Sequence, residues 1–177
     1  MHNIIEYNGF KWVDIVGPTE EDTRYLKDEF KLKPVSLRNI IPSIMHPDFE
    51  IFEDYISLIL HYPKNEEGGN VEIHELDILS GKNYLLTSHY IPIRPLTNMW
   101  DECVASEKIK ETYMRKGSGE LLFFILNKFL KRILEKTDKI GEEVASIEKE
   151  IFAGEEAKMI RKISYLKRKI ISFWRAT

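Results

Sequence analysis

Residues 118–152 read SGELLFFILNKFLKRILEKTDKIGEEVASIEKEIF, and this stretch decides the fold. Its apolar residues recur at intervals of three, four or seven, which is the period of one helix face. They are Leu122, Leu126, Phe129, Ile133, Ile140, Val144, Ile147 and Ile151. At ~1.5 Å per residue, a helix from Ser118 to Phe152 is about 50 Å long. The sequence therefore predicts one long amphipathic helix.

A second helical pattern follows an interruption at Gly154. Apolar residues recur there at alternating intervals of four and three, at Met159, Ile163, Leu166, Ile170 and Phe173. Because only a short break separates the two patterns, they predict a long antiparallel hairpin over residues 116–177.

The charges of the two helical segments agree with this pairing. Residues 136–156 carry seven acidic residues and three lysines, whereas residues 158–177 carry seven basic residues and no acid. Opposite charges on facing helices fix register and partner more than they add stability, since an exposed pair contributes about 0–1 kcal/mol. The part of the apolar stripe that the hairpin leaves uncovered is expected to contact other subunits.

Residues 1–115 mix short strand and helix patterns, which predicts an α/β domain. Phe10–Val16 alternates like a strand, and Thr19 with Asp22 forms an imperfect capping box for a helix that reaches Phe30. A further helix is predicted between Pro34 and Pro47, limited or bent by Pro42, and another near residues 96–104.

Three β-rich runs lie between these helices. They cover residues 51–62, 71–79 and 84–91, with turn-forming residues at 65–69 and 80–83. We expect these strands to be mostly antiparallel within a sheet that can be mixed. The alternation of the second run predicts that one of its faces is exposed to water.

Composition excludes several classes of function. With 177 residues and a net charge of -3, the chain lacks the basic surface that a nucleic-acid partner favours. The single Cys103 suits a reducing compartment and is expected to be a small buried hydrophobic residue. The start of the chain lacks a secretion signal, and the longest apolar run, Leu121–Leu126, is about a third of the ~20 residues of a membrane helix, which predicts a soluble chain.

No pattern of residues points to an enzyme. His46, His61, His74 and His89 have no partners at metal-ligand spacing, and His74 and Asp77 would lie on opposite faces of a strand. Residues 116–119 lack the ending of a phosphate loop, so they are interpreted as a helix start. A hydrolase or transferase is therefore disfavoured.

Several segments, in the right order, resemble the CorA family of divalent-cation transporters. They are residues 115–126 with 140–152 in the long helix, 163–170 in the next helix, and upstream the Trp12–Asp14, Pro18–Glu21, Glu53–Leu60 and Leu85–His89 segments. The resemblance covers nearly the whole chain. Each segment alone is degenerate, so collinearity carries the likeness.

The resemblance implies an α/β/α sandwich with a mixed sheet, followed by the helical hairpin, on the cytoplasmic side of the cell membrane. It further implies a homopentamer whose cytosolic domain senses Mg²⁺ or another divalent cation such as Co²⁺ and gates a pore. The family's pore helix and its Gly-Met-Asn signature are not in this sequence, so no conduction residue is carried over.

A regulatory metal site is the binding hypothesis that the resemblance suggests. The family's sensor carboxylate would fall near Pro63 and Lys64, where this sequence has none, and Glu66 and Glu67 are the nearest substitutes. Independently, the acidic run that includes Glu142 and Glu143 suits Mg²⁺, which keeps several waters and accepts one or two carboxylates. Losing the ion would leave like charges facing each other between subunits.

Two alternatives remain beside a magnesium, cobalt or nickel transporter. One is a zinc-transporting relative in the same superfamily, which shares this domain plan. The other is a stand-alone scaffold that binds partners through its helical hairpin.

Overall fold

The computed structural model describes residues 2–41, 46–65, 71–152 and 156–176 and consists of two compact units. The sheet unit comprises Met1–His61 and His74–Lys128, and the hairpin unit comprises Tyr62–Ile73 and Phe129–Thr177. Two strands and the long helix contribute residues to both units. The division at residues 115 and 116 stays a prediction.

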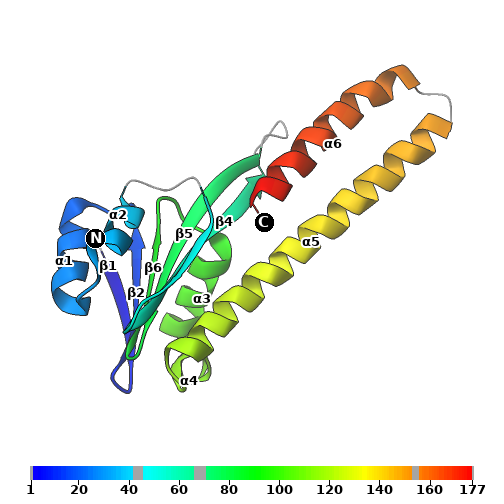
Figure 1. The fold of residues 1–177 in the computed structure, drawn as a ribbon. Coiled ribbons are helices and arrows are strands. Elements are labelled where there is room, and N and C mark those ends of the chain that lie inside the picture. Colours follow the sequence, from blue (N-terminus) through cyan, green and yellow to red (C-terminus); the bar gives the residue numbers. More distant parts are fainter. Residues whose placement is uncertain (1, 42–45, 66–70, 153–155, 177) are drawn as a thin grey trace. The chain divides into compact units, whose positions relative to one another are not determined.

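Six strands form one mixed sheet (Figure 1). Their bounds are β1 His2–Tyr7, β2 Phe10–Val16, β3 Asp48–Ile51, β4 Tyr55–Asn65, β5 Val71–Gly81 and β6 Tyr84–His89, in the order β1-β2-β6-β5-β4-β3. The pair β2–β6 is parallel, whereas β1–β2, β5–β6 and β3–β4 are antiparallel. The predicted mixed sheet is confirmed.

Helices cover both faces of the sheet (Figure 1). Helices α1 (Glu20–Phe30) and α2 (Pro34–Ile40) lie on one face, and α3 (Arg94–Ala105) and α4 (Glu107–Met114) lie on the other. The chain continues into α5 (Ser118–Phe152), a single helix of 35 residues, and α6 (Glu156–Ala176). The predicted α/β/α sandwich followed by a long helical hairpin is confirmed.

The face under α1 and α2 carries an apolar core. Because side chains alternate along a strand, every second residue of a central strand reaches this core. Its buried members are Val13, Ile15, Leu26, Leu32, Ile40, Tyr55, Leu79 and Leu86. The Tyr55 hydroxyl anchors α2, since it lies 2.8 Å from Ser36 Oγ and accepts a hydrogen bond from the Lys33 amide at 3.0 Å.

The opposite face is built around Trp12, which is fully buried and meets Trp100 of α3 edge-on at 4.9 Å. Cys103 is also buried, and burial raises the pKa of its thiol to about 11, so it is the small buried residue that was predicted. Glu102 of α3 contacts the two helices that follow it. Its Oε2 accepts hydrogen bonds from Tyr113 Oη of α4 and from Lys128 Nζ of α5, both at 2.8 Å. This cluster holds α3, α4 and the first turns of α5 together.

The local signals at helix starts act as predicted. Thr19 caps α1, and both hydrogen bonds of the capping box to Asp22 are present although Asp replaces the usual Glu. Gly117 adopts a φ of 82°, which few other residues tolerate, and α5 begins at the next residue. Helix α2 ends at Ile40, and Pro42 lies outside the described residues.

Two strand predictions were incomplete or wrong, and two elements were missed. The run 51–62 is two strands, since Phe52–Asp54 separate β3 from β4. The exposed face predicted for β5 is wrong for residues 75–79, which are all buried because helices cover both sides of the sheet. Strand β1 and helix α4 were not predicted.

Candidate functional site

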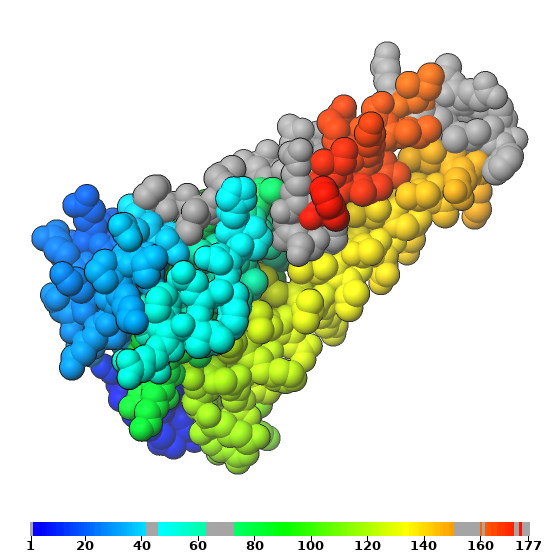
Figure 2. Space-filling view, viewed as in Figure 1, coloured from blue at the N-terminus to red at the C-terminus, as the bar shows by residue number. Residues whose placement is uncertain are grey.

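The hairpin unit pairs α6 with the second half of α5 (Figure 2). Ile147 of α5 and Leu166 of α6 are buried against each other's helix, with Ile140 and Val144 packed beside them. These residues belong to the two apolar stripes read from the sequence. The predicted hairpin interface is therefore the observed one.

Two ion pairs cross this interface. Lys162 Nζ lies 2.6 Å from Glu150 Oε2, and Lys169 Nζ lies 2.5 Å from Glu143 Oε1. Moving seven residues back along α5 and seven residues forward along α6 leads from one pair to the next, as an antiparallel register requires. The opposite charges of the two segments thus meet as predicted.

The metal candidates chosen from the sequence are only partly placed by the structure. Glu142 is exposed, and the Glu143 carboxylate accepts the hydrogen bond of Lys169. Glu66 and Glu67 lie outside the described residues. Within the described residues, no group of three or more His, Cys, Asp or Glu side chains is arranged to hold a metal. A metal role for these four glutamates stays a prediction.

An apolar groove of about 430 Å³ runs along the hairpin. Its lining residues are Val144, Ile147, Glu148, Ile163, Leu166, Lys167, Ile170 and Ile171. Ile163 and Ile170 are 43% and 42% exposed, although both belong to the predicted apolar stripe of α6. The hairpin therefore buries only part of its apolar surface within the chain.

Cations gather at the other end of the hairpin unit. Lys136 Nζ lies 4.6 Å from the centre of the Tyr62 ring, a cation–π contact. Burial, with Arg132 and Lys169 nearby, lowers the pKa of Lys136 to about 8. Lys169 is itself buried, so its pairing with Glu143 neutralises a charge that would otherwise be costly there.

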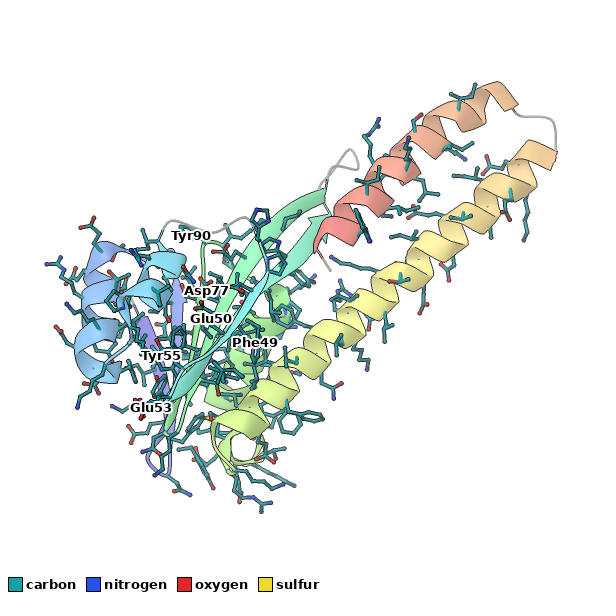
Figure 3. All side chains as sticks on the ribbon, in the orientation of Figure 1. Phe49, Glu50, Glu53, Tyr55, Asp77 and Tyr90 are labelled. Carbon is teal, nitrogen blue, oxygen red and sulfur yellow. The ribbon has the colours of Figure 1, made fainter. Side chains whose placement is uncertain are left out.

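A second polar cluster lies in the sheet unit, on the face that α1 and α2 cover (Figure 3). Asp77 of β5 and Ser88 of β6 are cross-strand neighbours. Each stands two residues from a member of the apolar core, Leu79 or Leu86, and therefore points to the same face. On the neighbouring strands, Glu50 of β3 pairs with Ser57 of β4, which stands two residues from Tyr55. We call Glu50, Asp77 and Ser88 the polar row.

The carboxylate of Asp77 is the most perturbed group of this row. Asp77 is only 3% exposed, and burial together with the Glu75 carboxylate raises its pKa to about 8. Among the described residues, neither Asp77 oxygen has a hydrogen-bond partner, and the same holds for Ser88 Oγ and Glu50 Oε2. Buried polar atoms usually have partners, so this row calls for an explanation.

The other face carries a buried polar group whose members lie close to one another, although His89 Nε2 has no hydrogen-bond partner among the described residues. Thr87 Oγ1 donates to Asp14 Oδ1 at 2.6 Å, and Trp12 Nε1 donates to Thr87 Oγ1 at 3.2 Å. His89 Nε2 lies 3.3 Å from the same Asp14 oxygen, while His89 Nδ1 lies 2.7 Å from the Ile91 carbonyl. His89 thus links β2 to the connection that leads into α3, and we interpret it as structural.

Sequence reasoning did not identify the polar row. It placed Asp77 correctly on a strand, opposite in direction to His74, but assigned neither Asp77 nor Glu50 a role. The available signal was an acid at positions 75 and 77, four and two residues before Leu79, on a strand whose middle is apolar. Cross-strand neighbours depend on register, which the sequence did not provide.

A protein-family model matches almost the whole chain. The model described as "CorA-like Mg2+ transporter protein" matches residues 7–177. The Bacillus subtilis protein YfjQ, whose name is that of a proposed metal ion transporter, is 23% identical over 77% of this chain and 41% of its own length. The cobalt/magnesium transport protein CorA of Thermotoga maritima is 21% identical over 90% of this chain and 45% of its own length. The chain thus spans less than half the length of these curated relatives.

Solved structures share the fold. The soluble domain of CorA from Methanocaldococcus jannaschii superposes with a TM-score of 0.76 at 23% identity, covering 94% of this chain and 65% of that one. The cytoplasmic domain of ZntB from Vibrio parahaemolyticus gives a TM-score of 0.63 at 17% identity, covering 96% and 68%. None of the helices in the described residues combines the length and apolar character needed to cross a bilayer. The family match over almost the whole chain shows that this protein belongs to the CorA-like Mg²⁺ transporter family.

Proposed function

We propose that this chain is the cytosolic regulatory and assembly domain of a CorA-like Mg²⁺ transport protein, which also accepts Co²⁺ or Ni²⁺. The observation that carries the proposal is the family match over residues 7–177. The paired hairpin supports it, because a rod with an uncovered apolar groove is suited to contact further helices or subunits.

In this proposal the domain lies on the cytoplasmic side of the membrane and assembles as a homopentamer. Divalent cations at carboxylates between subunits would hold neighbouring domains together, because the ion neutralises charges that otherwise repel. Loss of the ion would let the domains separate and change the state of the pore. Mg²⁺ would therefore regulate its own transport.

Zinc transport is the second candidate, and the fold shared with the ZntB cytoplasmic domain favours it. The two functions differ in the ion that is moved, which the domain itself does not determine. A stand-alone scaffold that uses only the hairpin groove is the third candidate, and it belongs to a different functional class.

Reading the gene beyond codon 177 and measuring ion uptake tests these candidates together. We expect two apolar helices with a Gly-Met-Asn sequence between or before them, and restored growth of Mg²⁺-uptake-deficient bacteria at low Mg²⁺ when the whole gene is expressed. Uptake of Zn²⁺ without Mg²⁺ would replace the proposal by the zinc candidate. A stop codon directly after Thr177 would favour the scaffold.

A further inference from the structure

A hollow of about 350 Å³ lies between helices α1 and α2. All of its lining residues belong to α1, to α2 or to the residue that follows α2, so the hollow lies within the sheet unit. Its volume suits a small ligand, since ligand pockets in proteins commonly measure about 300–1,000 Å³.

Three of the lining residues are cations. Arg24 and Lys27 lie on α1, Arg38 lies on α2, and all three are exposed. Across the described ranges, no carboxylate forms an ion pair with any of them. Glu20 is the acid of the lining. Three positive charges minus one negative charge give the lining a net charge of +2, on a chain whose own net charge is -3.

Arg24 is held by a backbone contact that leaves most of its donors available. Its Nε donates a hydrogen bond to the Glu20 carbonyl at 3.3 Å. Within the described part of the chain, Nη1 and Nη2 have no acceptor. A guanidinium binds the oxygen atoms of a phosphate or carboxylate group with parallel N–H donors, so Arg24 is suited to an oxyanion.

Helix dipoles explain only two of the three cations. Lys27 and Arg38 lie in the last turns of their helices, where a positive charge offsets the partial negative charge of the helix end. Arg24 lies in the second turn of α1, so this reason does not apply to it. A ligand of negative charge accounts for all three.

The lining also has an apolar part, formed by Leu37 and Ile41. Both side chains are partly buried and pack against the apolar core under α1 and α2. An apolar or aromatic part of a ligand would remove their remaining surface from water, which is favourable. Inorganic phosphate has no such part and would leave this surface uncovered.

We propose that the hollow between α1 and α2 binds a small phosphate monoester whose organic part is apolar or aromatic, such as a nucleoside monophosphate. The phosphate group would contact Arg24, Lys27 and Arg38, and the organic part would lie against Leu37 and Ile41. A phosphate monoester carries about −1.5 to −2 charges at pH 7, which balances the lining more closely than the single charge of a carboxylate does.

This binding goes beyond the proposed transport role and involves none of the metal candidates. Because the ligand would contact both α1 and α2, it would bind the folded sheet unit and not the unfolded chain. The free energy of unfolding should therefore rise with ligand concentration.

Isothermal titration calorimetry of the 177-residue chain with adenosine monophosphate (AMP), in a buffer of low ionic strength without phosphate or divalent cations, tests the site. We expect saturable binding of one AMP per chain in the micromolar to millimolar range. Arg24→Gln and Arg38→Gln should each weaken binding by about tenfold or more, since each removes charge-assisted hydrogen bonds to the phosphate. Adenosine and inorganic phosphate each lack one part of the ligand and should bind about tenfold more weakly or less.

Two control variants separate this site from a general attraction between cations and phosphate. Arg115→Gln removes an exposed arginine outside the hollow and should keep the affinity of the unaltered chain. Glu20→Gln removes the acid of the lining and should tighten binding by about twofold or more, because it removes a charge that repels the phosphate. Far-UV circular dichroism checks that every variant is folded. Should Arg24→Gln or Arg38→Gln fail to fold, the other still reports on the site.

Absence of saturable AMP binding up to about 10 mM, a concentration that fills even a millimolar site, overturns the proposal. So does AMP binding that is unchanged in both Arg24→Gln and Arg38→Gln, and so does an equal affinity for AMP and inorganic phosphate. These results leave the transport function to be decided by the uptake assay of the whole gene. Conversely, AMP binding that depends on the two arginines stands even where uptake of Mg²⁺ fails.

Discussion

Asp77 shows how the surroundings of one side chain change its chemistry. A carboxyl group on a strand edge would titrate near its ordinary pKa of 3.8, whereas burial raises the pKa of Asp77 to about 8. The folded chain therefore binds this proton much more tightly than the unfolded chain. This difference must appear as a dependence of stability on pH.

We expect the chain to lose stability as pH rises from about 4 to about 8. Over this range Asp77 ionises in the unfolded chain but keeps its proton in the folded chain. The free energy of unfolding therefore falls by at most about 1.4 kcal/mol per pH unit. Above pH 8 Asp77 is ionised in both the folded and the unfolded chain, so its contribution to the free energy of unfolding is constant. Asp77→Asn should remove this contribution, so the variant gains stability relative to the unaltered chain as pH increases.

Urea denaturation at several values between pH 5 and pH 8 measures this difference. Glu53→Gln is the control, since its exposed carboxylate should leave the pH profile unchanged. A constant difference between Asp77→Asn and the unaltered chain at all pH values would contradict the assignment of a raised pKa to Asp77.

At the scale of elements, two ion pairs join the helices of the hairpin, and their lysine side chains differ in burial. Lys169 exposes 11% of its side chain and pairs with Glu143, whereas Lys162 exposes 44% and pairs with Glu150. Removing a partner from a buried charge costs more than removing one from an exposed charge. The Glu143–Lys169 pair is therefore the one that should matter for hairpin stability.

Glu143→Gln should lower the free energy of unfolding by about 1–3 kcal/mol, because it leaves Lys169 buried beside Lys136 without its carboxylate. The neighbouring exposed residue gives the control, and Glu142→Gln should change stability by less than about 0.5 kcal/mol. Thermal melting followed at 222 nm compares the two variants. Equal stabilities would show that the pair is too well solvated to contribute.

The long elements and several short ones could be predicted from sequence, whereas β1 and α4 could not. Over 35 residues, the stripe of α5 repeats often enough to define a helix and its partner. Strand β1 and strand β3 lie at the two edges of the sheet, and most of their residues are exposed or half-exposed, which leaves no clear alternation. Helix α4 has 8 residues, of which only Met114 is buried, so it shows no apolar period.

For the molecule as a whole, the share of its relatives' length that the chain covers determines the behaviour we expect in solution. We expect the isolated chain to be a monomer or a weak oligomer, since it spans less than half the length of its curated relatives and most of a pentamer interface would lie elsewhere. Sedimentation velocity at increasing concentration measures this. A tight pentamer at micromolar concentration would contradict the expectation.

The spacing of the hairpin ion pairs has a mechanical consequence. Sliding α6 by one turn, about 5.4 Å, along α5 would bring Lys169 opposite Ile147 in one direction and opposite Lys139 in the other. Opposite Ile147, Lys169 would lose its carboxylate partner and be buried beside an apolar side chain. Opposite Lys139, it would face a like charge. In both cases the Glu150–Lys162 contact is lost as well. The two helices therefore resist sliding past each other, so a force on one end of the hairpin moves both helices together.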